Sequence, residues 1–108
     1  MLEVKGKTIS VHRGDAGSFT ITFTGEDKPD DGVKVLFSIK RANTRDAPVV
    51  RSKEITVGES KAEVSLTRED TALAVGTYYW DVCIMWPETP WTPMDPEPFI
   101  IKAVAHDV

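Results

Sequence analysis

The sequence predicts an all-β fold, a single β-sandwich of about seven antiparallel strands. Three observations predict it: apolar and polar residues alternate along most of the chain, glycines and prolines fall between the alternating stretches, and 108 residues leave room for one domain. A period of two places one face of a strand in a core and the other in water. We therefore expect one domain over residues 1–108.

The two clearest strands are residues 18–24 and 33–40. In the first, every odd position is a large apolar residue and every even position carries a hydroxyl group. The second repeats the alternation, and only Leu36 interrupts its polar face. Between them, residues 25–32 combine glycine, proline and carboxylates, which favour turns. We interpret this segment as a solvated loop, because it lacks the Asp-x-Asp-x-Asp-Gly spacing of a calcium loop.

A hairpin is predicted around Gly58, which would supply the positive φ of a type II′ turn. Pairing Val57 with Ser60 places Ile55 opposite Ala62 and leaves Val64 and Leu66 on the same inner face. The same register sets Glu54 opposite Glu63, at a small repulsive cost.

The strand predicted from Thr77 to Trp86 is the bulkiest, so we expect it to be central. It places Tyr78, Trp80, Val82, Ile84 and Trp86 on one face, and Tyr79, Asp81, Cys83 and Met85 on the other. Asp81 is therefore either exposed or paired with a basic residue on a neighbouring strand. Further strands are expected at residues 2–4, 9–11, 49–50 and 99–104. Their spacing is typical of an immunoglobulin-like sandwich.

Composition and charge exclude several classes of function. The net charge of −4 disfavours binding to nucleic acid, and Cys83 has no partner for an internal disulfide. His12 and His106 provide no ligand set for zinc, and we expect no cofactor. The N-terminus lacks the apolar core of a signal peptide, and no stretch is long enough to cross a membrane, so we expect synthesis in a reducing cytoplasm.

The sequence predicts no catalytic site. Cys83 lies mid-strand among apolar residues, where a cysteine usually packs rather than reacts, and no nucleophile has a plausible base. Arg13-Gly14-Asp15 spells the tripeptide of integrin ligands, but a bend between two strands accounts for it. We therefore expect a protein that is not an enzyme.

The segment from residue 87 to residue 98 contains five of the seven prolines. Trp86 directly precedes this segment, and Trp91 and Met94 lie within it. Proline lacks the ladder donor, so regular strand pairing is excluded there. Three interpretations compete: the loop folds back and caps the sandwich, it docks a protein partner through its aromatic residues, or it stacks on sugar rings. Trp86, Trp91 and Met94 are the candidate partner-binding residues.

A structural corner is predicted before the bulky strand. Thr67 followed by Asp70 resembles a helix-start cap lasting about one turn. Tyr78, at the start of the strand, can send its hydroxyl back to the backbone of that corner and stiffen it, as tyrosines do in immunoglobulin-like domains. Asp70 and Tyr78 are therefore assigned structural roles.

Several motifs together resemble the N-terminal domain of phage baseplate upper proteins, over nearly the whole chain. They are RGDAGSFTI at 13–21, GVKVLFSIK at 32–40, LTREDT at 66–71 followed by VGTYYWDV at 75–82, and PFII at 98–101. Domains of that family show a Gly-Asp-Thr-Gly-x-Phe start, an Asp-Thr and Gly-Thr-Tyr corner and a Phe-x-Ile end, on an immunoglobulin-like sandwich.

The resemblance implies a structural virion component of a phage or prophage, which joins the tail baseplate by binding other tail or baseplate proteins, with self-association as a further option. It implies no enzyme. Two departures from the family pattern are expected: no coiled-coil or receptor-binding extension such as these proteins often carry, and a last loop unusually rich in proline and tryptophan. A small tail or head decoration protein is therefore an alternative, and a surface carbohydrate-binding or adhesion module using Trp86 and Trp91 is another.

Overall fold

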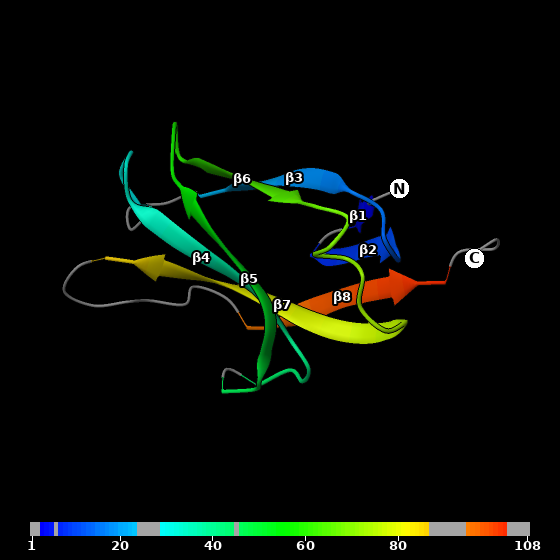
Figure 1. The fold of residues 1–108 in the computed structure, drawn as a ribbon. Helices are drawn as coiled ribbons and strands as arrows, with labels where there is room; N and C mark the ends of the chain where they lie inside the picture. Colours follow the sequence, from blue (N-terminus) through cyan, green and yellow to red (C-terminus); the bar gives the residue numbers. More distant parts are fainter. Residues whose placement is uncertain (1–2, 6, 24–28, 45, 87–94, 104–108) are drawn as a thin grey trace.

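The structure is a computed structural model, and it describes residues 3–5, 7–23, 29–44, 46–86 and 95–103. Within these residues all regular elements are β-strands, which agrees with the predicted all-β class (Figure 1). In chain order they are β1 (Glu3–Lys5), β2 (Thr8–His12), β3 (Gly17–Thr22), β4 (Lys34–Lys40), β5 (Val49–Thr56), β6 (Lys61–Leu66), β7 (Gly76–Met85) and β8 (Glu97–Lys102).

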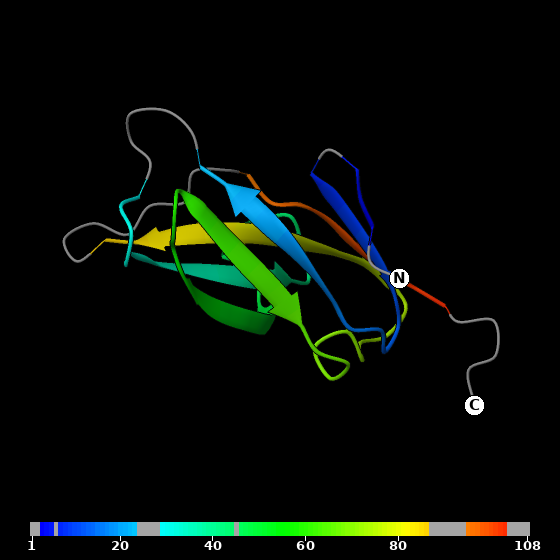
Figure 2. The same ribbon diagram turned by 90° about the horizontal axis from the view of Figure 1, so that it is seen from above.

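The strands form two layers of a β-sandwich. The larger sheet has six strands in the order β1-β2-β8-β7-β4-β5, and the smaller sheet pairs β3 with β6. Seen from above, β3 and β6 cross over the larger sheet (Figure 2). The predicted central place of the bulky strand is correct, because β7 lies between β8 and β4.

One pairing differs from the predicted antiparallel sandwich. Strand β2 pairs with β8 in parallel, with Ile9 opposite Phe99 and Val11 opposite Ile101. The alternation of residues 9–11 fixes which side chains face the core, and that face is the same for either strand direction. All four of these side chains are buried, so the parallel pair satisfies the pattern equally well.

The core lies between the two sheets and is centred on aromatic side chains from both. The ring of Phe37 on β4 lies 5.5 Å from that of Phe19 on β3 and 5.7 Å from that of Trp80 on β7. The indole nitrogen of Trp80 donates a hydrogen bond to the backbone oxygen of Lys7 at 2.9 Å, which satisfies its polar atom. The packed rings hold the two layers together, because truncating one of them would leave a destabilising cavity between the sheets.

The predicted register of the hairpin around Gly58 is wrong, although its inner face is right. Ile55 on β5 lies opposite Val35, and Ala62 on β6 lies opposite Ile21, so the two arms belong to different sheets. Only one isolated bridge, between Gly58 and Lys61, joins them. Each arm pairs with another strand of its own layer, β5 with β4 and β6 with β3, and both still direct apolar side chains into the core.

The turn itself is one residue later than predicted. Glu59 and Ser60 both have positive φ, 54° and 61°, whereas Gly58 does not. Two consecutive positive φ values are the pattern of a type I′ turn rather than type II′. The predicted opposition of Glu54 and Glu63 is therefore absent: Glu54 lies opposite Leu36, and Glu63 opposite Thr20.

Candidate functional site

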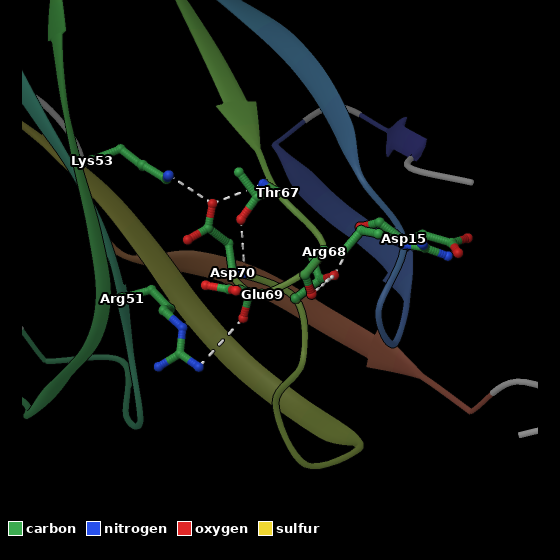
Figure 3. A network of polar contacts seen from close by, with 8 residues as sticks. Asp15, Arg51, Lys53, Thr67, Arg68, Glu69 and Asp70 are labelled. Atoms are coloured by element: carbon green, nitrogen blue, oxygen red, sulfur yellow. Dashed lines mark hydrogen bonds and ion pairs between the residues drawn. The ribbon is translucent and has the colours of Figure 1, made fainter. Parts of the chain in front are cut away.

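The best-defined polar site is the turn at residues 67–71, which follows β6 (Figure 3). The backbone N–H of Thr67 donates to Asp70 Oδ2 at 2.8 Å, and the backbone N–H of Asp70 donates to Thr67 Oγ1 at 3.2 Å. This reciprocal pattern is that of a capping box, here closing a single turn with no regular helix after it. Because both side chains accept hydrogen bonds from the backbone, the turn is held locally.

Two cations on β5 reach across from the larger sheet to this turn. Lys53 Nζ lies 2.7 Å from Asp70 Oδ2, and Arg51 Nη2 donates to the carbonyl of Glu69 at 3.4 Å (Figure 3). Residues 51 and 53 share the inward parity of Ile55, so charged side chains occupy core-facing positions of the strand at the open side of the sandwich. They brace the two layers where β5 and β6 do not pair.

Asp70 is the electrostatic centre of this brace. Partial burial raises the pKa of its carboxyl, but the hydrogen bonds from Lys53 and Thr67 outweigh that effect and hold the pKa below the ordinary value of 3.8. Its side chain is 13% exposed and that of Lys53 is 32% exposed, so water screens the pair only in part. The sequence predicts the corner role of Asp70 but not its contact with Lys53. The one sign of Lys53 in the sequence is that its position in the strand faces the core.

The Arg13-Gly14-Asp15 tripeptide lies against the same turn. Thr71 is fully buried, and its hydroxyl donates to the carbonyl of Asp15 at 2.7 Å. The Arg13 side chain donates through Nε to the carbonyl of Leu73 at 3.1 Å. Gly14 has a φ of 82°, which favours glycine at this bend. These contacts support the interpretation of the tripeptide as a bend between strands.

Tyr78, the other predicted corner residue, lies at the start of β7 and is 8% exposed. Its hydroxyl donates a hydrogen bond to the carbonyl of Ala74 at 2.8 Å, four residues upstream. The side chains of Thr67, Asp70, Thr71 and Tyr78 thus all make hydrogen bonds within the fold.

Asp81 is buried although it faces away from the core. Its Oδ2 atom lies 2.7 Å from Lys40 Nζ, and the two side chains are 5% and 9% exposed. Of the two alternatives for Asp81, pairing with a basic residue on a neighbouring strand is the one found. Lys40 lies opposite Tyr79 in the β4–β7 register, so the ion pair runs diagonally between the strands.

The three candidate partner-binding residues are described only in part. Trp86 is half-buried and packs against the core, which leaves only part of its ring accessible. Trp91 and Met94 lie outside the described residues, as does His106. Cys83 is half-buried on the outer face of β7, with its Sγ atom 3.9 Å from the carbonyl oxygen of Ile84.

Among the residues that the structure describes, no group of three or more His, Cys, Asp or Glu side chains is placed to hold a metal ion. The same residues include no helix long and apolar enough to span a bilayer. The sequence matches no family model and none of the curated proteins with which it was compared.

The open edges of the sheets are the remaining candidate surfaces. Within the described residues, β1 and β5 end the larger sheet, and β3 and β6 each pair on one side only. Unpaired edges present N–H and C=O groups that can accept another strand. The edge of β5 is partly closed, because Arg51 Nη1 donates to the carbonyl of Val50 at 2.8 Å and the register shifts at Ile39/Lys40.

Proposed function

We propose that the chain is an immunoglobulin-like, non-enzymatic assembly module of a phage or prophage tail, which docks protein partners of the baseplate type. In immunoglobulin-like sandwiches, strands B and E share one sheet, strands C, F and G share the other, and variable-type domains add C′ beside C. The pairing of β3 with β6, and the run β8-β7-β4-β5, fit this arrangement.

The hydrogen bond of Tyr78 supports the same topology. The tyrosine corner of these domains is a Tyr near the start of strand F whose hydroxyl bonds to backbone a few residues upstream. Tyr78 occupies the corresponding place in β7 and bonds to Ala74. The motif residues that resemble the baseplate family at positions 66–78 are thus used to build this corner.

The observation that carries the docking role is the set of open strand edges that the described part of this small sandwich presents. The Lys53–Asp70 and Lys40–Asp81 pairs join one strand to a turn or to another strand, so these charges serve the fold. Backbone groups at an edge, by contrast, can pair with an extended segment of another protein. Docking through edges and through residues 87–98 is therefore the mechanism that we propose.

The virion role is tested by inducing the phage or prophage and purifying its particles. We expect an antibody against the chain to detect it in tail-containing particles. Its absence from purified particles, with the protein abundant in the lysate, would exclude the role.

The role of residues 87–98 is tested with Trp91→Ala. We expect the melting temperature to stay nearly unchanged while co-purification with baseplate proteins is lost, because an aromatic anchor contributes to binding rather than folding. A large loss of melting temperature with binding retained would assign the loop to capping. Specific signals on a glycan array, lost in Trp91→Ala, would instead favour the carbohydrate-binding alternative.

A further inference from the structure

Among the described residues no strand pairs with the edge of β3 that faces away from β6, here called the free edge, and its hydrogen-bonding groups are arranged for a further strand. In the β3–β6 register Thr22 lies opposite Lys61, and the next pair is linked by the Phe23 N–H donating to the Ser60 carbonyl at 2.8 Å. Bonded and non-bonded pairs alternate along an antiparallel ladder. The N–H and C=O groups of Ser18, Thr20 and Thr22 therefore point away from β6, toward the free edge.

The core-facing side chains of β3 remain partly exposed at this edge. Phe19 and Ile21 are only half-buried, whereas Ala62 and Val64 opposite them on β6 are both 0% exposed. The two strands lie over the same core, and the ring of Phe19 lies 6.0 Å from that of Trp80. Phe19 and Ile21 therefore keep exposed apolar surface that a strand paired beside β3 would help to cover.

The charge pattern of β3 differs from that of β5. None of the six residues of β3 is charged, and the side chains on its outer face are hydroxyls. Strand β5 carries Arg51 and Lys53 on its inward face and has a register shift, which are devices that discourage edge pairing. Two copies of β5 paired about Lys53 would also set like charges opposite each other, whereas two copies of β3 would not.

We propose that the free edge of β3 pairs with β3 of a second copy of this chain, antiparallel about a two-fold axis at Thr20. In this register Thr20 lies opposite Thr20, Ser18 opposite Thr22, and Phe19 opposite Ile21. The last pair is non-bonded, so its side chains approach most closely and cover each other's exposed surface. The contact is isologous and joins the two small sheets into one with the order β6-β3-β3-β6.

This inference deepens the proposed function, since it names one partner of an open edge, but the dimer does not depend on a virion role. About six backbone hydrogen bonds cross the axis, two at the Thr20 pair and two at each Ser18–Thr22 pair. The strands are short, so the interface is small and we expect association that depends on protein concentration.

The test is sedimentation equilibrium over a wide concentration range, with Thr20→Lys as the main variant. We expect the wild type to shift from its monomer mass of 12.0 kDa toward twice that mass as concentration rises. Thr20→Lys places two ammonium groups together at the axis and should raise the dissociation constant at least about tenfold. Ser65→Lys is the matched control, because it adds the same charge to the same sheet face on β6, away from the axis.

Thr20→Pro provides a second variant, which removes an edge N–H that the β3–β6 ladder does not use. Circular dichroism reports whether each variant folds. A wild type that stays at 12.0 kDa at every concentration would overturn the proposal, as would equal weakening by Ser65→Lys. If a variant loses the dimer but still captures baseplate proteins, the proposed dimer is supported and the proposed tail role is unaffected.

Discussion

Removing the Asp70 carboxylate should destabilise the fold by about 2 kcal/mol, in two parts. Asp70 accepts the Thr67 backbone N–H at 2.8 Å, and losing such a cap costs about 1 kcal/mol. Its ion pair with Lys53 is 2.7 Å long but 32% exposed on the lysine side, so we discount it for screening to about 1 kcal/mol. Asp70→Ala should lose the stabilisation from both the cap and the ion pair, whereas Asp70→Asn should lose mainly that from the ion pair.

A double-mutant cycle separates these parts. We expect Asp70→Asn and Lys53→Met each to lower the free energy of unfolding by about 1 kcal/mol, with the double variant losing little more than either. Urea unfolding at neutral pH measures all four proteins. Strict additivity of the two single changes would refute the brace between β5 and the turn, because the side chains would then not interact.

The same pair predicts a dependence on pH. The pKa of Asp70 lies below its ordinary value of 3.8 in the folded protein, so the folded state binds the proton more weakly than the unfolded state. The stabilisation is therefore present above 3.8 and is lost as pH falls through the folded pKa. We expect the stability difference between wild type and Asp70→Asn to shrink in acid. A difference that is constant down to the lowest measurable pH would contradict the lowered pKa.

Two further substitutions test the other buried polar contacts. Asp81→Ala should cost about 3 kcal/mol, because it removes the carboxylate beside the buried Lys40 ammonium, and the Lys40→Met/Asp81→Leu double variant should recover most of that loss in urea unfolding. An Asp81→Ala protein as stable as wild type would contradict this account. Tyr78→Phe should cost about 1 kcal/mol by loss of its hydrogen bond to Ala74, and an unchanged midpoint would show that the corner does not depend on the hydroxyl.

Alternation was enough to predict the core-facing side chains, because the period of a strand fixes its faces independently of its neighbours. Tyr78, Trp80, Val82 and Ile84 are all buried as expected. Strand partners were less accessible to prediction. The predicted hairpin pairs β5 with β6 because they are adjacent in sequence, whereas each strand pairs within its own sheet, β5 with β4 and β6 with β3.

The charged residues of the site show the same limit. Asp81 was correctly placed on the outer face, but alternation alone does not say which cation lies diagonally across a neighbouring strand. Arg51 and Lys53 have the same parity as the inward-facing Ile55, so the alternation places two charged side chains on the core face. Charged residues at core positions were the sign in the sequence that this side of the sandwich is open. Identifying their partners required the turn at residues 67–71 to be placed in space.

The parallel pairing of β2 with β8 also determines how the domain would bear load. Tension that pulls on the start of β2 and the end of β8 acts at opposite ends of one ladder, because the strands run in the same direction. The ladder, from Ile9 and Phe99 to His12 and Lys102, is then sheared along its length, so its hydrogen bonds resist together instead of opening one after another. Pulled in this way, the sandwich would yield abruptly rather than unzip.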